Sequence, residues 1–127
     1  MSSIEDFKEI LKHSEPLAKY SYFKIGGPAQ FFLEPRNVDE LQAVVLCCVE
    51  NEIPVRVFGG GSNILIKDSG VQGAVIRIHD EEFGKIQIDG TTVTAGAGAL
   101  LSNLVSQTVK AGLAGLEGLV GIPGTVG

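Results

Sequence analysis

Three consecutive glycines, Gly59 to Gly61, separate two runs of apolar residues in the stretch VFGGGSNILI. A strand that reaches Phe58 has to end there, because glycine inside a strand weakens it through backbone entropy. The pattern predicts a strand over residues 55–58 before the glycines and another over 63–67 after them. The glycines form either a plain turn between strands or a place where the backbone approaches a ligand closely, and both alternatives stay open at this point.

A phosphate group is the ligand that such a loop suits best, since backbone N–H groups can converge on the anion where no side chain blocks them. Ser62 and Asn63 add a hydroxyl and an amide to this candidate site. No Gly-Lys-Ser/Thr follows, so the loop is not a Walker A motif. The later stretch GAGALL, Gly96–Leu101, begins like a dinucleotide fingerprint but has leucine at its last small position. A conventional P-loop or Rossmann site is therefore disfavoured.

Charge and hydropathy exclude several other classes of function. The 127-residue chain has a formal net charge of −5 and no cluster of Lys or Arg, so a surface for nucleic acid or anionic membrane is not expected. The N-terminus is charged and no apolar run approaches the ~20 residues of a membrane span, which predicts a cytoplasmic protein. The only cysteines, Cys47 and Cys48, are adjacent, so we expect both to be reduced and structural, with no metal site.

Apolar periodicity predicts a mixed α+β domain. Helices are predicted over residues 4–11, capped by Ser3 or Ser2, over 38–50, capped by Asn37 with Glu40 three residues later, and over 100–110, ended by Gly112. The buried face of the second helix is predicted to comprise Val38, Leu41, Val44, Val45, Cys48 and Val49. Further extended segments are predicted at 20–25, 29–33 and 73–78, with a turn at 68–70 and a hairpin over 85–96 that turns at Asp89-Gly90.

Four glycine-containing segments occur in a fixed order: YSYFKIGGPAQFFLEP (Tyr20–Pro35), VRVFGGGSNILIKDSGVQGAVIRI (Val55–Ile78), TAGAGALLSNLV (Thr94–Val105) and GLAGLEGLVGIPGTVG (Gly112–Gly127). Together they resemble the UDP-N-acetylenolpyruvoylglucosamine reductase family over roughly residues 18–127. The resemblance implies an FAD-binding domain of the vanillyl-alcohol-oxidase or PCMH type, made of two small α+β subdomains. Residues 1–17 would form an N-terminal helix and a lead-in to the domain, and 18–78 would form the first subdomain. Residues 79–127 would begin a second, truncated subdomain, with the substrate-binding domain absent.

The same resemblance implies FAD as the cofactor. The residues expected to hold it are Gly59, Gly60, Gly61, Ser62, Asn63, Ile64, Gly121, Ile122, Pro123, Gly124 and Thr125. Residues 59–63 would wrap the pyrophosphate, and 121–125 would line the flavin. Neither His nor Cys occurs between Val57 and Ile66, so we expect non-covalent FAD, with His13 and His79 as surface or structural residues. Gly96 and Gly98 are expected to pack beside the cofactor, while Lys24 faces either the flavin or solvent.

For the full-length protein, the resemblance implies NADPH-dependent reduction of UDP-N-acetylglucosamine enolpyruvate to UDP-N-acetylmuramate, in the synthesis of peptidoglycan precursors. The expected proton donor and its arginine and glutamate partners lie after Gly127, so no catalytic residue is predicted in this chain. We expect a monomer that is inactive alone, a small nucleotide-sugar substrate, and further protein covering the apolar tail. The alternatives are the FAD-binding domain of another PCMH-type oxidoreductase and a non-catalytic flavin-binding module.

Overall fold

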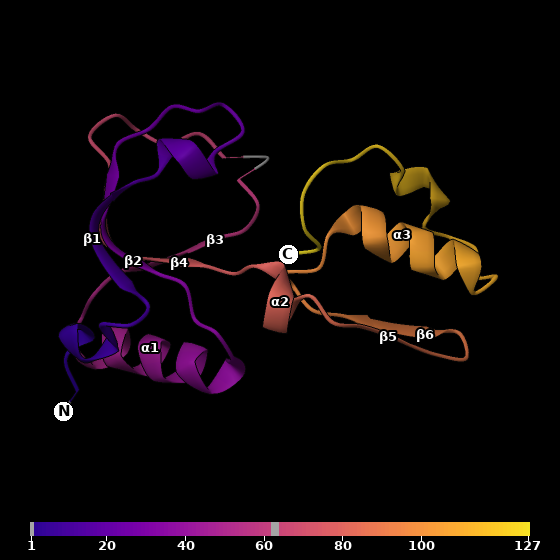
Figure 1. The fold of residues 1–127 in the computed structure, drawn as a ribbon, viewed down its shortest axis with the longest axis horizontal. Helices are drawn as coiled ribbons and strands as arrows, with labels where there is room; N and C mark the ends of the chain where they lie inside the picture. Colours follow the sequence, from indigo (N-terminus) through magenta and orange to yellow (C-terminus); the bar gives the residue numbers. More distant parts are fainter. Residues whose placement is uncertain (1, 62–63) are drawn as a thin grey trace.

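A four-stranded sheet dominates the first part of the computed structural model, which describes residues 2–61 and 64–127. Its strands are β1 (Leu11–Pro16), β2 (Pro28–Leu33), β3 (Val55–Phe58) and β4 (Val71–Arg77). They lie in the order β1-β2-β4-β3, as Figure 1 shows. β1 is antiparallel to β2, whereas β2 and β3 both run parallel to β4. The carboxyl ends of three strands therefore meet at one edge of the sheet, where ligands of parallel sheets commonly bind.

Helix α1 (Val38–Glu50) covers one face of this sheet, and its predicted start and end are confirmed. The Asn37 side chain accepts the N–H of Glu40 at 2.8 Å. Val44, Cys47 and Cys48 are buried against the sheet, and both cysteines are free. Val38, Val45 and Val49 were predicted on this face but are 59%, 38% and 68% exposed. At 3.6 residues per turn, all three lie about 100° or more around the helix from Val44, so the sheet does not cover them fully.

The other face of the sheet is covered by residues 64–70 of the connection from β3 to β4, together with Leu17 and Tyr20. A buried cluster on that face comprises Leu17, Ala29, Phe32, Phe58, Ile66 and Val75. The predicted strand over 63–67 is wrong for residues 64–67, which form no strand, and residue 63 lies outside the described residues. Two parallel strands cannot be joined by a hairpin, so the connection has to cross over the sheet. The predicted turn at 68–70 is confirmed by the Gly70 N–H, which donates to the Lys67 carbonyl at 2.9 Å.

The N-terminal predictions need correction. Ser3 does cap a helical turn, but this 3-10 helix, η1, ends at Phe7, and Leu11 begins strand β1. The strand forms because residues 11–16 pair with β2, which supplies backbone partners that a local pattern does not reveal. The predicted extended segment over 20–25 is wrong: Tyr20 ends a second 3-10 helix, η2 (Ala18–Tyr20), and residues 21–25 follow it as a loop. The predicted strand over 29–33 is confirmed as β2.

A second group of elements follows the sheet: α2 (Asp80–Phe83), β5 (Ile86–Asp89), β6 (Thr92–Ala95), α3 (Leu101–Lys110) and the 3-10 helix η3 (Glu117–Leu119). Figure 1 shows it beside the sheet, joined to it through the chain between β4 and α2. The hairpin is confirmed, but Asp89 pairs with Thr92, so the turn is Gly90-Thr91, one residue later than predicted. Gly90 has φ +61°, which suits the first central position of a type II′ turn.

Helix α3 is confirmed over its predicted length, and Gly112 ends it as expected. Gly112 has φ +76°, its N–H donates to the Val109 carbonyl, and the Leu113 N–H donates to the Thr108 carbonyl. These two hydrogen bonds form a Schellman motif. No helix among the described residues combines the length and the apolar character that crossing a bilayer requires.

The C-terminal segment returns to the start of α3. The Val126 N–H donates to the Ala99 carbonyl and the Gly127 N–H to the Ala97 carbonyl, both at 2.9 Å. The Leu101 N–H in turn donates to the Gly124 carbonyl at 3.0 Å. These bonds bring the chain end to the junction between the two groups of elements, as Figure 1 shows.

Candidate functional site: a cavity between two glycine segments

A cavity of about 580 Å³ lies between the glycine loop that follows β3 and the C-terminal segment. Its described lining residues are Val57, Phe58, Gly59, Gly60, Gly61, Ile64, Ile122, Pro123, Gly124, Thr125, Val126 and Gly127. Eight of the eleven residues singled out from the sequence are in this set. Gly121 does not line the cavity, and Ser62 and Asn63 lie outside the described residues. Two segments about 60 residues apart in the chain thus form one concave site.

The two walls approach each other at Gly59. A Cβ atom built on Gly59 would lie 3.0 Å from Thr125 Oγ1, which is tighter than ordinary packing allows. One wall is held by the end of β3, and the other by the hydrogen bonds between residues 124–127 and 97–101. A side chain at Gly59 would therefore occupy space between the walls.

The three consecutive glycines differ in their surroundings. Gly61 is buried with φ +75°, and a Cβ there would collide with the carbonyl of Tyr20. Its own carbonyl accepts the Tyr22 N–H at 2.9 Å. Gly60, in contrast, is exposed and lines the cavity. The fold itself therefore requires glycine at position 61, whereas Gly59 and Gly60 present bare backbone to the cavity.

Among the described residues of this site, the backbone is the main source of electrostatic attraction. None of the described lining residues carries a charged side chain, and Thr125 supplies the one hydroxyl among them. Within the described part of the chain, the N–H groups of Gly60 and Thr125 donate to no other backbone group. Free N–H groups beside glycine are the donors that phosphate groups use in loops of this kind. The cavity volume also falls in the range typical of small-molecule sites, about 300–1,000 Å³.

Four lining residues were missed by the sequence analysis: Val57, Phe58, Val126 and Gly127. Strand alternation could have indicated Val57, since Phe58 is buried and its neighbour Val57 is 69% exposed on the opposite face. Nothing local could have indicated Val126 and Gly127. Their position depends on hydrogen bonds to Ala97 and Ala99.

Other residues considered from the sequence lie elsewhere. A Cβ on Gly96 or Gly98 would meet the backbone of Phe83 or His79, so both glycines pack against the chain itself and neither lines the cavity. The exposed Lys24 donates from Nζ to the Lys19 carbonyl at 3.4 Å. The described residues contain no group of three side chains able to hold a metal ion.

The two histidines are also outside the cavity lining. His13 Nε2 lies 3.1 Å from a Glu5 carboxylate oxygen on the surface, and His79 Nε2 lies 4.0 Å from Glu34. His79 immediately precedes α2. Both positions agree with the expected surface or structural role.

A family model described as an FAD binding domain matches residues 29–127, most of the chain. The chain belongs to this FAD-binding domain family. FAD is therefore the cofactor of the domain, as the sequence predicted, and the α+β fold class is confirmed as well.

Relatives of known name support the same assignment. The chain is 47% identical over 116 residues to the UDP-N-acetylenolpyruvoylglucosamine reductase of Rubrobacter xylanophilus, covering 91% of this chain and 39% of the relative. It is 39% identical over 123 residues to the enzyme of that name from Rhodopirellula baltica, covering 97% and 40%. The chain thus spans about two fifths of the length of these curated relatives.

Solved structures agree on the fold. The crystal structure of UDP-N-acetylenolpyruvylglucosamine reductase from Thermus caldophilus matches with a TM-score of 0.71 and 39% identity, covering 92% of this chain and 40% of that one. A solvent-stable cholesterol oxidase matches with a TM-score of 0.63 at 24% identity, over 87% of this chain and 22% of that one. At this lower identity, the likeness shows the fold alone.

Proposed function

We propose that this chain is the FAD-binding part of an NADPH-dependent reductase that converts UDP-N-acetylglucosamine enolpyruvate to UDP-N-acetylmuramate. The observation that carries the proposal is the cavity between residues 59–61 and 122–127, in a chain 39–47% identical to reductases of that name. The cholesterol oxidase likeness favours no second activity, because it extends to the fold only. The same proposal places the protein in the cytoplasm and treats it as a monomer.

The proposed cofactor contacts follow from the cavity. Backbone N–H groups of Gly59 and Gly60 would face the pyrophosphate, and Ile122, Pro123 and Thr125 would form the opposite wall. We include Ser62, Asn63 and Gly121 in the proposed set from the sequence motif alone. When bound, FAD carries a hydride from NADPH to the substrate. The described part of this chain contributes binding and orientation through backbone donors, and the proton donor would come from polypeptide beyond Gly127.

Attachment of the cofactor is proposed to be non-covalent. Covalent attachment would need a nucleophilic side chain at the cavity, and the described lining holds neither His nor Cys. Cys47 and Cys48 lie on α1 and are buried against the sheet, and this burial together with the neighbouring thiol raises the pKa of Cys48. Denaturation should therefore release intact FAD from the protein.

The proposed subdomain division places residues 18–78 in one unit and 79–127 in the start of another. The transition from β4 to α2 at Ile78–Asp80 supports this boundary. Pairing of β1 with β2 adds residues 11–16 to the first sheet, so the proposed lead-in shortens to the residues before Leu11.

The binding proposal is tested by replacing Gly59 with alanine. A methyl group there would lie between the cavity walls, and inserting a methyl into a packed site costs about 1–3 kcal/mol, so FAD affinity should fall about tenfold. Gly118→Ala is the matched control, because a Cβ at Gly118 meets nothing within 4 Å. Flavin absorbance and fluorescence titration measure both affinities. Unchanged FAD affinity in Gly59→Ala would show that the glycine loop is not part of the FAD site.

Activity is tested separately. A protein that contains this chain and is as long as the curated relatives should oxidise NADPH when UDP-N-acetylglucosamine enolpyruvate is added. The 127-residue chain by itself should not. Steady turnover by the chain alone would contradict the assignment of the proton donor to later polypeptide. A full-length protein that binds FAD but ignores this substrate would overturn the proposed reaction and leave the cofactor assignment in place.

A further inference from the structure

The glycine loop packs against Tyr20 and the residues that follow it. Gly61 lies so close to the Tyr20 carbonyl that a Cβ atom would collide with it, and the Gly61 carbonyl accepts the Tyr22 N–H at 2.9 Å. Gly59 and Gly60, which present bare backbone to the flavin cavity, directly precede Gly61. The position of Tyr20 therefore constrains where the N–H groups of these two glycines lie.

Tyr20 is attached to the core of the sheet by its side chain. Its ring stacks on the fully buried ring of Phe32 in β2, with 4.8 Å between the ring centroids and 22° between the ring planes. Its hydroxyl donates to Glu15 in β1 at 3.3 Å, and its N–H donates to the carbonyl of the buried Leu17 at 3.0 Å. Tyr20 thus connects two strands of the sheet to the glycine loop.

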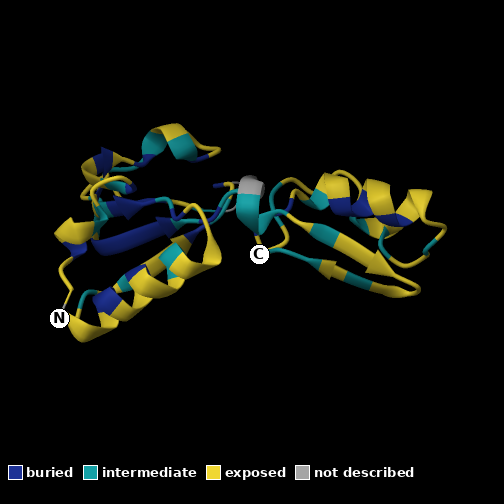
Figure 2. Ribbon diagram, turned by 60° about the horizontal axis from the view of Figure 1, so that its bottom comes forward, coloured by how far each residue is buried: buried dark blue, intermediate teal, exposed yellow. Residues whose placement is uncertain are grey.

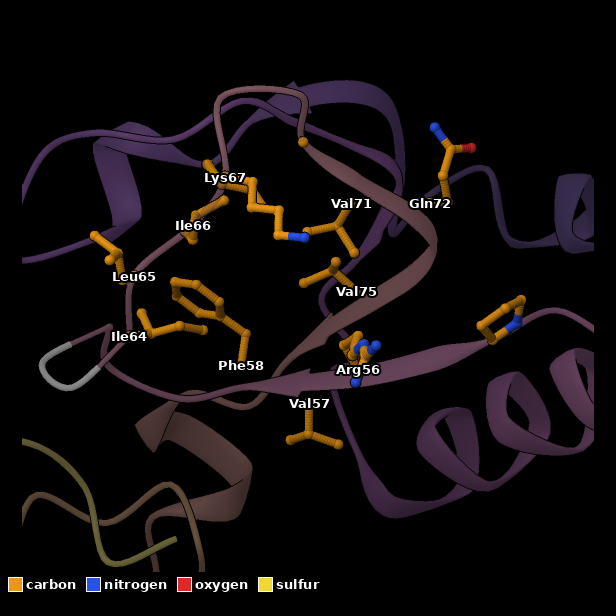
Figure 3. Close-up of a pocket in the computed structure, with 13 residues that line it drawn as sticks. Arg56, Val57, Phe58, Ile64, Leu65, Ile66, Lys67, Val71, Gln72 and Val75 are labelled. Carbon is orange, nitrogen blue, oxygen red and sulfur yellow. The ribbon is translucent and has the colours of Figure 1, made fainter.

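Arg77 reaches the same ring from the end of β4. It pairs in register with Phe58, the last residue before the glycines. Figure 3 shows Phe58 pointing to the side of β3 where Val75 lies, and Val57 pointing to the other side. Val75 and Arg77 are two residues apart on β4, so they share a face of the sheet. On that face, Arg77 Cζ lies 5.2 Å from the centroid of the Tyr20 ring.

The Arg77 guanidinium is partly removed from water. Its Nη1 donates to the Glu34 carboxylate at 2.9 Å, whereas its Nε is buried and has no hydrogen-bond partner among the described residues. Attraction to the face of an aromatic ring offsets part of the cost of burying such a cation. The contact with Arg77 therefore stabilises the Tyr20 ring in its place beside the glycine loop.

We propose, on the basis of the FAD site proposed above, that Tyr20 is a positioning residue for the flavin cavity and that Arg77 acts through its ring. Neither residue is among the described residues that line the cavity, so both affect the cofactor only through the loop. Tyr20 holds Gly61, and Gly61 holds the N–H groups of Gly59 and Gly60 toward the pyrophosphate. The apparent FAD affinity depends on the fraction of molecules whose loop is in this position.

The test compares FAD affinity among variants of a flavin-free protein that contains this chain and is as long as the curated relatives. Tyr20→Leu should weaken FAD binding about tenfold, because it removes both the aromatic stack and the cation–π contact. Tyr20→Phe keeps the ring and should bind within about twofold of the parent. Val44→Ala is the matched control, since Val44 is fully buried in the cluster on the opposite face of the sheet. It should lower stability and leave FAD affinity unchanged.

The role of Arg77 is tested by coupling. Arg77→Met should weaken FAD binding about threefold in the parent and have no further effect in Tyr20→Leu, because the contact through which it acts is then absent. An equal effect in both backgrounds would show that Arg77 acts through Glu34 or by another route. This variant keeps the Tyr20 ring, so it tests the proposal even if Tyr20→Leu does not fold.

Amide exchange at Tyr22 reports on the loop itself, because this N–H is bonded to the Gly61 carbonyl. Without FAD, exchange there should be about tenfold faster in Tyr20→Leu than in the parent, and unchanged in Val44→Ala. The proposal is overturned if Tyr20→Leu binds FAD as the parent does. It is also overturned if Tyr20→Leu and Val44→Ala lose affinity equally, which would indicate a general effect of stability.

Gly59→Ala, measured in the same titration, separates failure of this proposal from failure of the FAD site. Unchanged affinity in Gly59→Ala would reject the flavin cavity, and the role of Tyr20 with it. Weaker binding in Gly59→Ala together with parental affinity in Tyr20→Leu would reject the role of Tyr20 alone.

Discussion

The sheet region, residues 4–78, and the hairpin region, residues 79–127, bury their apolar side chains very differently. Both buried clusters of the described chain draw their fully buried members from the sheet region, one on each face of the sheet. In the hairpin region the described buried residues are Gly98, Ala99, Leu104, Val105 and Thr108. Figure 2 shows the contrast as dark blue central strands beside a yellow and teal hairpin.

Because of this difference, the two walls of the flavin cavity are held in place in different ways. The wall formed by the glycine loop is attached to β3, in a region with its own core. The wall formed by residues 122–127 is held by a few backbone hydrogen bonds, and Ile122 and Val126 remain exposed on it. A two-stranded hairpin is only marginally stable by itself. We therefore expect the second wall to gain order when the cofactor occupies the cavity, because binding favours the ordered form.

The largest expected effect is on the core of the sheet region. Phe32 is fully buried and its ring stacks on Tyr20 at 4.8 Å between centroids. Phe32→Ala should lower the free energy of unfolding by about 3–5 kcal/mol. Leu104→Ala, in the less buried hairpin region, should cost about 2 kcal/mol, at the low end for such changes. Urea denaturation measures both. Equal losses would show that the two regions have equivalent cores.

Hydrogen exchange should show the same contrast without any substitution. The amides of Ala74, Val75 and Ile76 lie in the central strand β4 and should exchange only on global unfolding. Those of β5 and β6 should exchange at least about a hundredfold faster, through local opening of the hairpin. FAD should slow exchange at Val126 and Gly127 relative to β5. Uniform protection across both regions would contradict the comparison.

A smaller, pH-dependent effect is expected in the sheet region. Burial tends to raise the pKa of Glu15, but its hydrogen bonds to Lys19 and Lys12, both 3.2 Å away, leave that pKa below its ordinary value of 4.5. The unfolded chain then binds more protons as pH falls, so the ion pairs stabilise the fold above about pH 4.5 and this contribution is lost as pH falls through the folded pKa.

Glu15→Gln should accordingly reduce stability at pH 7 by about 1–2 kcal/mol, and the difference from the parent should narrow as the pH drops below 4.5. Thermal melts at a series of pH values provide the measurement. A difference that stays constant down to acidic pH would mean that the carboxylate charge is not what stabilises this position.

The smallest effect is expected at the hairpin turn. Gly90 has φ +61° and a Cβ there would meet nothing within 4 Å, so Gly90→Ala costs backbone strain alone, about 1 kcal/mol. The loss should appear as faster amide exchange in β5 and β6, with little change in β4. Gly118→Ala serves again as the control. Equal destabilisation of β4 would show that the two regions unfold as one unit.

Local signals in the sequence determined much of the secondary structure. Asn37 and Glu40 mark the start of α1, and Gly112 marks the end of α3, because caps depend on side chains within a few residues of the helix end. The glycine loop after Phe58 and the hairpin near Gly90 could likewise be predicted from turn chemistry. The order of the four glycine-containing segments was enough to indicate the FAD-binding family.

Tertiary structure alone decided the remaining features. Residues 11–16 form a strand because β2 lies beside them, and residues 64–67 form none because two parallel strands require a crossover. Residues 59–61 and 122–127 share one cavity because the chain end bonds to residues 97–101, an arrangement that no local pattern encodes. Gly61 shows the same division: the sequence marks it as a special position, but only packing against Tyr20 reveals that the fold, rather than a ligand, requires glycine there.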